Sequence, residues 1–191
     1  MNPRRLKLTS ILLGIALSGL VLLAWTQQWF AIVLATGASV TVGGDVAAPA
    51  LTALALSGLA LAAALALAGV VFRVVLGILQ AALGALVVTS SVMAIANPVA
   101  ASAQAISAAT GVGGTASVMA LVTSTGSTAW PVVALLAGIL IVLLGIATVA
   151  TARRWPASSR KYQAVRMEPA DGESTIGDWD ALSDGRDPTS R

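Results

Sequence analysis

The chain has almost no charged residues over most of its length. Between Thr9 and Ala152 the only charged side chains are Asp45 and Arg73. The chain as a whole is 57% hydrophobic and only 10% charged. A water-soluble fold needs a polar and charged surface, and this composition lies well outside that of soluble domains. The sequence therefore predicts an integral membrane protein.

Four apolar segments are long enough to cross a bilayer. About 20 apolar residues are needed, because a helix rises about 1.5 Å per residue and the hydrocarbon core is about 30 Å thick. The segments are Leu8–Trp25, Pro49–Phe72, Val74–Ala96 and Trp130–Thr151. Only Arg73 separates the second from the third, and we place it at a tight turn between two helices. The predicted fold class is all-α, an integral membrane four-helix bundle.

Basic residues mark one side of the predicted membrane domain. They precede the first span, lie between the second and third, and follow the fourth, whereas the connections 26–48 and 97–129 contain no Lys or Arg. Basic segments stay in the cytoplasm, so both termini of this multi-pass plasma-membrane protein are predicted to be cytoplasmic. The topology residues are Arg4, Arg5, Lys7, Arg73, Arg153 and Arg154. For Arg73, a buried cation facing an anionic ligand is the alternative.

The chain divides into a four-span membrane domain, residues 1–155, and a tail, residues 156–191. Residues 1–167 hold nine basic groups against Asp45 alone, whereas residues 168–191 hold two basic groups and seven acids. Basic groups at membrane edges meet anionic headgroups, so the basic excess does not indicate nucleic-acid binding. The acidic tail is predicted to be cytoplasmic and mostly disordered. The first span lacks a convincing cleavage site and is expected to remain as a true span.

Small residues recur on single faces of the predicted helices. They are Gly14 and Ser18 in the first span, Gly77 and Gly84 in the third, and Gly138 and Gly145 in the fourth. The glycines of the last two pairs are seven residues apart, about two turns, so each pair lets a neighbouring backbone approach one helix face. The pattern predicts tight helix packing, with a substrate channel along these faces as the alternative. The same faces suit a homo-oligomer.

The residue types that carry most enzyme chemistry are missing. The chain has no cysteine and no histidine, which removes thiolate nucleophiles, the usual general base near neutral pH and the commonest metal ligand. Gly43-Gly44-Asp45 is faintly similar to the signature of intramembrane aspartyl proteases, but no second acid exists in the membrane region to form the required pair. We therefore expect no enzyme activity, no cofactor and no metal.

Aromatic and polar residues flank the spans on the predicted outer side. Trp25, Gln28, Trp29 and Trp130 lie there, together with Asp45. Indole rings favour the membrane interface, so anchoring explains the tryptophans, and helix capping or a solvated loop explains Asp45. The alternative is a ligand mouth that combines aromatic faces, amide donors and a carboxylate.

The long connection 97–129 contains short helix-like pieces. Residues 98–109, after Asn97-Pro98, suit an interfacial helix, and residues 117–122 suit a second apolar turn. The glycine-rich run 110–114 between them is expected to be flexible. Such a connection suits a lid over the helix ends, and no conformation is assigned to it.

Several stretches together resemble one family of membrane proteins. They are Trp25 and Trp29, residues 47–56 (AAPALTALAL), Thr128-Ala129-Trp130-Pro131, Arg153-Arg154-Trp155-Pro156, and the ending Trp179-Asp180-Ala181-Leu182 with Asp187-Pro188-Thr189. Over nearly the whole chain this combination resembles the tryptophan-biosynthesis-associated membrane proteins of high-GC Gram-positive bacteria. The resemblance implies a four-span membrane protein linked to tryptophan biosynthesis, and it supplies no catalytic residues.

Three functions are compatible with these features. The first is a non-enzymatic membrane accessory protein whose tail docks a cytoplasmic protein through Trp179 and Leu182, the apolar island of a solvated segment. The second is a small permease or exporter subunit for an aromatic amino acid or precursor, working as an oligomer. The third is a structural envelope protein. The lipid bilayer is a partner in all three.

Overall fold

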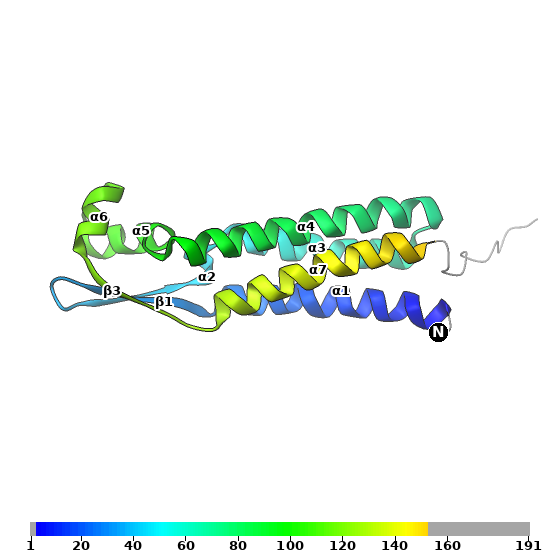
Figure 1. The fold of residues 1–191 in the computed structure, drawn as a ribbon, viewed down its shortest axis with the longest axis horizontal. Coiled ribbons are helices and arrows are strands. Elements are labelled where there is room, and N and C mark those ends of the chain that lie inside the picture. The colour runs from blue at the N-terminus through cyan, green and yellow to red at the C-terminus, as the bar shows by residue number, and fades with distance from the viewer. Residues whose placement is uncertain (1–2, 153–191) are drawn as a thin grey trace, which may run out of the picture. The chain divides into compact units, whose positions relative to one another are not determined.

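Four long helices run side by side through the part of the chain that the computed structural model describes, residues 3–152. They are α1 (Pro3–Thr26), α3 (Ala50–Leu67), α4 (Val70–Ala96) and α7 (Trp130–Thr151) (Figure 1). Each is long and apolar enough to cross a membrane, which confirms the predicted four-helix membrane fold. The predicted topology residues Arg153 and Arg154, and the predicted docking residues Trp179 and Leu182, lie outside the described residues.

α4 and α7 each bury one continuous stripe of residues. On α4 the stripe is Arg73, Gly77, Gln80, Gly84, Val87, Ser91 and Ala94. On α7 it includes Pro131, Ala134, Gly138, Ile141, Gly145 and Thr148. The steps between these positions alternate between three and four residues, and an average near 3.5 is typical of left-handed helix bundles. We call the contact between these two stripes the α4–α7 seam.

The turn between α3 and α4 lies at Ala68-Gly69, so the prediction that places Arg73 in this turn is wrong. Ala68 and Gly69 have extended backbones, with ψ angles of 134° and 176°. Arg73 lies in the first turn of α4 instead. The charge of Arg73 suggests a turn at the wrong position for two reasons. Glycine ends a helix more readily than arginine does. In addition, the aliphatic stem of an arginine packs well inside a helical bundle.

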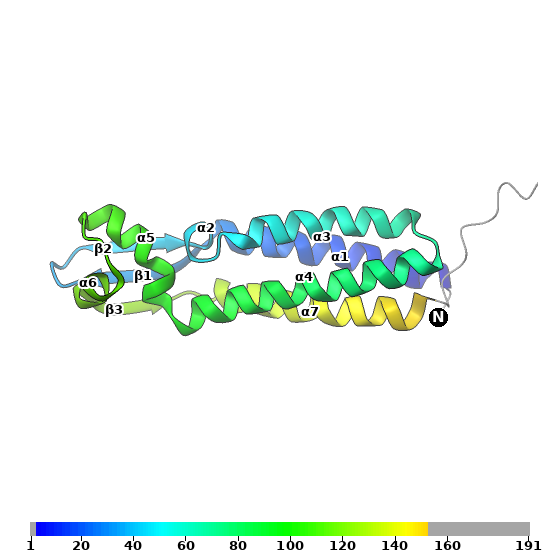
Figure 2. The same ribbon diagram turned by 90° about the horizontal axis from the view of Figure 1, so that it is seen from above.

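A three-stranded antiparallel sheet joins the two long connections at the other end of the bundle. β1 (Gln28–Leu34) and β2 (Ser39–Gly43) form a hairpin, and β3 (Val122–Ser127) pairs with the free edge of β1 (Figure 2). The strand order is therefore β2-β1-β3. The hairpin turn needs Gly37, whose φ of 83° is unfavourable for residues with a side chain. The sequence did not predict this sheet.

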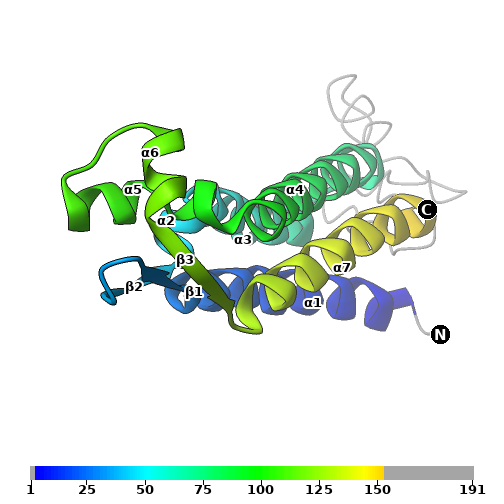
Figure 3. The same ribbon diagram turned by 60° about the vertical axis from the view of Figure 1, so that its left-hand side comes forward.

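Three short helices complete this end of the molecule, which we call the cap. α2 (Gly44–Ala47) follows the hairpin, and α5 (Pro98–Thr110) and α6 (Thr115–Leu121) fill most of the second connection (Figure 3). α5 covers the helix expected at 98–109. Inward side chains of the sheet, α5 and α6 belong to the same buried cluster as those of the four long helices. The cap and the adjoining half of the bundle therefore share one hydrophobic core.

Candidate functional site

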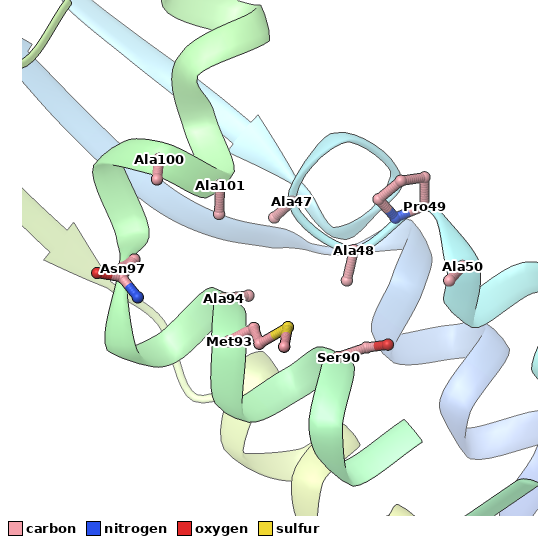
Figure 4. A pocket seen from close by; sticks show the side chains of 10 residues that line it. All are labelled: Ala47, Ala48, Pro49, Ala50, Ser90, Met93, Ala94, Asn97, Ala100 and Ala101. Carbon is pink, nitrogen blue, oxygen red and sulfur yellow. The ribbon is translucent and has the colours of Figure 1, made fainter. Parts of the chain in front are cut away.

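A groove of about 500 Å³ lies where the cap meets the helices. α2 and the start of α3 form one wall, and the end of α4 and the start of α5 form the other (Figure 4). The lining is alanine except for Pro49, Ser90, Met93 and Asn97. We call this hollow the cap groove. None of its lining residues carries a charge, so it suits a mainly apolar ligand.

The Asn97-Pro98 pair creates one wall of the cap groove. Proline has no N–H and disfavours a helical conformation of the residue before it, so α4 ends there and α5 starts in a new direction. The N–H of Asn97 donates to the Met93 carbonyl at 3.1 Å, and the Asn97 carbonyl accepts the N–H of Ala101 at 2.9 Å. These bonds hold the bend between the two helices, and this bend separates α5 from α4 enough to leave the groove.

Two buried serine hydroxyls belong to the helices that form one wall of the groove. Ser91 and Ser102 are both fully buried, and neither Oγ atom has a hydrogen-bond partner. Ser91 is one turn before Ala94 on the same face of α4, and Ser102 follows Ala101 on α5. Both of these alanines line the groove. Both hydroxyls are closed off from the groove, and each costs free energy because it is buried without a partner.

The residues of the predicted ligand mouth do not line the cap groove. Trp29 is fully buried, and its indole N–H donates to the Ala24 carbonyl at 2.7 Å. Trp29 is thus not part of a surface mouth. It is buried outside the alternation of β1, in which Phe30, Ile32 and Leu34 face the core, and it lies at the register shift between Gln28 and Phe30. Trp25 and Trp130 are half-buried, and Gln28 and Asp45 are exposed.

Asp45 and its glycine neighbours fix the short helix α2. The Asp45 carboxylate lies against Gly43 in the first turn of α2, where the helix dipole favours a negative charge. A Cβ atom on Gly44 would lie 2.6 Å from Nε1 of Trp29 and 2.7 Å from the carbonyl oxygen of Trp25. Glycine at this position therefore allows α2, and with it one wall of the cap groove, to pack directly on the end of α1.

The structure brings the two predicted glycine pairs of the α4–α7 seam together. A Cβ atom on Gly77 would lie 3.1 Å from the carbonyl oxygen of Gly145, and one on Gly84 would lie 2.9 Å from that of Gly138. One on Gly145 would lie 2.6 Å from the backbone nitrogen of Ala81. These neighbours are backbone atoms, which cannot rotate away as a side chain does. The two helices thus leave no space for a substrate channel between them at these positions.

Gly14 of α1 packs against a buried amide that the sequence reasoning missed. A Cβ atom on Gly14 would lie 3.5 Å from Nε2 of Gln80, and side chains of α3 and α7 lie within 4 Å of the same point. Gln80 is 5% exposed, and its Oε1 atom has no hydrogen-bond partner. Gln80 is visible in the sequence as a single amide inside an apolar span, and polar residues at such positions are often functional, so this signal could have identified it. Ser18, one turn further along α1, is buried beside Gly58.

Basic side chains cap helix ends at the end of the bundle opposite the cap. The Lys7 ammonium donates to the Ala66 carbonyl at 2.7 Å, and Nη1 of Arg73 donates to the Ala152 carbonyl at 3.4 Å. These carbonyls lie at the C-terminal ends of α3 and α7, where the helix dipole favours a cation. Arg4 and Arg5 belong to the first turns of α1 at this same end. We call it the basic end.

Within residues 3–152 no cluster of acidic, histidine or cysteine side chains is arranged to hold a metal ion. Asp45 is the sole acid of that range. The cap groove brings together hydroxyl, amide, thioether and apolar side chains, which can bind and position a molecule.

This fold defines a four-span membrane protein with a mixed α/β cap over one end of its helices. The family model of the tryptophan-associated transmembrane proteins matches residues 11–189, and the chain belongs to this family. The resemblance found in the sequence is thereby confirmed. Neither a curated protein nor a solved structure matches the chain. The family description connects the protein with tryptophan and specifies no molecular activity.

Proposed function

We propose that this chain is a non-enzymatic accessory protein of tryptophan biosynthesis that acts from the plasma membrane. The observation that carries the proposal is the closed α4–α7 seam, in which two of the four helices pack backbone against backbone. Ion-coupled pumps place acids inside their spans, whereas Asp45, the sole acid of residues 3–152, is exposed on the cap. A closed bundle with an uncharged groove under its cap suits ligand sensing or the anchoring of a partner.

The proposal includes an orientation of the protein in the membrane. Arg5, Lys7 and Arg73 belong to the basic end, and the connections that form the cap contain no Lys or Arg. Basic segments remain preferentially in the cytoplasm. The basic end and both termini then face the cytoplasm, and the cap with its groove faces outward.

Deletion of the gene tests the tryptophan link directly. We expect the deletion strain to grow more slowly without added tryptophan and to have altered pools of aromatic precursors, because an accessory factor of the pathway is missing. Growth and precursor pools are measured with and without tryptophan, and a plasmid copy is the control. Normal growth together with unaltered pools contradicts the proposal and leaves the structural envelope role.

A small permease or exporter subunit is the second candidate, and the buried amide of Gln80 favours it. Polar groups inside transmembrane bundles often line the paths of substrates. Uptake of labelled tryptophan and anthranilate into vesicles that contain the purified full chain separates the two candidates. Flux above that of empty vesicles, abolished by Gln80→Leu, supports the permease. Flux equal to that of empty vesicles leaves the accessory role.

The tail is proposed to dock a cytoplasmic protein through Trp179 and Leu182. The support is the sequence of this segment, in which two apolar residues stand among acids and small residues, as in short motifs that fold on binding. Crosslinking in cells should capture a partner with the full chain and lose it with the double variant Trp179→Ala, Leu182→Ala. An unchanged set of captured proteins contradicts the docking role.

A further inference from the structure

The cap groove lies at the level of the membrane surface and not in its centre. α4 has 27 residues and is therefore about 40 Å long, whereas the hydrocarbon core is about 30 Å thick. Ser90, Met93 and Asn97, which line the groove, belong to the last two turns of this helix or follow it. Trp25 at the end of α1 and Trp130 at the start of α7 mark the same level, because indole rings favour the interface.

The lining selects against charged ligands. A zwitterionic amino acid needs partners for its ammonium and carboxylate groups once it leaves water, and no lining residue carries a charge. The Asp45 carboxylate lies against Gly43 at the start of α2, two positions before the lining residue Ala47. Asp45 itself is exposed and is not among the residues that line the groove.

The polar atoms and the single thioether of the groove suit an aromatic ring with one polar group. Met93 lies along the groove (Figure 4), and thioethers make favourable contacts with aromatic rings. The hydroxyl of Ser90 and the side-chain amide of Asn97 supply the polar side-chain atoms of the lining. A volume of about 500 Å³ is that of a small-molecule site.

We propose that the cap groove binds an uncharged aromatic molecule with one ring N–H, of the size of indole. The uncharged lining disfavours a zwitterionic amino acid, and the interfacial level and the thioether favour an aromatic ring over an acyl chain. The inference deepens the proposed link to tryptophan metabolism and rests on it. It places the binding function at the cap and not along the α4–α7 seam.

Equilibrium dialysis of labelled indole against the full chain in nanodiscs tests this proposal. The nanodiscs contain phosphatidylethanolamine and phosphatidylglycerol, and empty nanodiscs measure the indole that dissolves in the lipid. We expect saturable retention of indole by the protein, competition by unlabelled indole, and no competition by tryptophan at the same concentration. Retention no greater than that of empty nanodiscs, or equal competition by tryptophan, overturns the proposal.

A matched pair of variants on α5 locates the bound molecule. Ala100 is exposed and lines the groove, whereas Ala109 is exposed on the same helix and is not among the lining residues. Ala100→Phe should fill the groove and weaken indole binding by about tenfold or more, and Ala109→Phe should leave it unchanged. Ser90→Ala is a smaller change that leaves the packing intact. It should weaken indole binding several-fold, because it removes a hydrogen-bond acceptor.

The outcomes of these measurements separate this inference from the proposed function. Equal binding by the wild type, Ala100→Phe and Ser90→Ala overturns the groove as the indole site. Phospholipid that co-purifies with the protein and that indole fails to displace also overturns it and identifies the groove as a lipid site. In either case the growth and precursor pools of the deletion strain still decide the link to tryptophan biosynthesis.

Discussion

Gly145→Val should unfold the bundle or prevent its assembly. A Cβ atom at this position would lie 2.6 Å from the backbone nitrogen of Ala81 and 2.7 Å from the carbonyl oxygen of Gly77. Neither neighbour is able to rotate away, so α4 and α7 must move apart at this point of the seam. Overpacking of a rigid core costs typically about 1–3 kcal/mol, and rigid backbone on both sides places this variant at the upper end or beyond. Thermal unfolding of the purified protein, followed by circular dichroism, measures the decrease in stability as a lower transition temperature.

Gly19→Val is the matched control for this prediction. Gly19 lies in the transmembrane helix α1, is exposed, and has no atom within 4 Å of its ideal Cβ position. The same substitution there changes helix propensity and lipid contact without touching another helix. We expect a transition temperature close to that of the wild type. If Gly145→Val and Gly19→Val lower the transition temperature equally, the close approach at Gly145 does not hold α4 and α7 together.

Single cysteines should report opposite sides of the membrane for the cap and the basic end. The natural chain has no cysteine, so each introduced thiol is the sole site of reaction with a maleimide. Ser39→Cys in the exposed start of β2 should react with a membrane-impermeant maleimide in intact cells. Leu67→Cys, exposed at the end of α3, should react only after the cells are permeabilised. The contrast is close to all-or-none, because the bilayer excludes the reagent.

The unmodified chain, which should not react under either condition, is the control for this labelling. Reaction of Leu67→Cys in intact cells, with Ser39→Cys protected, contradicts the proposed orientation. Reaction at both positions in intact cells indicates a mixed topology. Either result removes the argument that places the cap groove outside the cell.

The long helices are predictable from the sequence because their signal is local. Apolar runs of sufficient length, the glycine spacing and the Asn97-Pro98 break all act within one helix or between neighbours. The sheet is different, because Phe30 pairs with Ser127, nearly a hundred residues away. β3 is almost wholly exposed, and its sequence VTSTGS has no alternation of apolar and polar residues that would indicate a strand. Its pairing becomes visible only in three dimensions.

The candidate site is less predictable than the fold. Tryptophans and a carboxylate near the ends of spans indicate a ligand site in the sequence. In the structure Trp29 is a core residue and Asp45 lies at the start of a short helix. The cap groove is instead lined mostly by alanines from segments about fifty residues apart, such as Ala47 and Ala101. Alanine is common in every apolar helix of this chain, so no pattern distinguishes the residues that leave a space from those that fill one.

The central position of β1 has a consequence for how the protein is made. Its two partners are synthesised at different times, since β2 follows β1 at once and β3 comes only after α3, α4, α5 and α6. During synthesis one edge of β1 therefore stays without its strand partner until the last connection has been made. α7 follows β3 directly in the chain, so this helix inserts soon after β3 has been synthesised. The final span and the final strand thus complete the fold together, and a chain that ends before residue 122 leaves one edge of β1 unpaired and open to pairing with another chain.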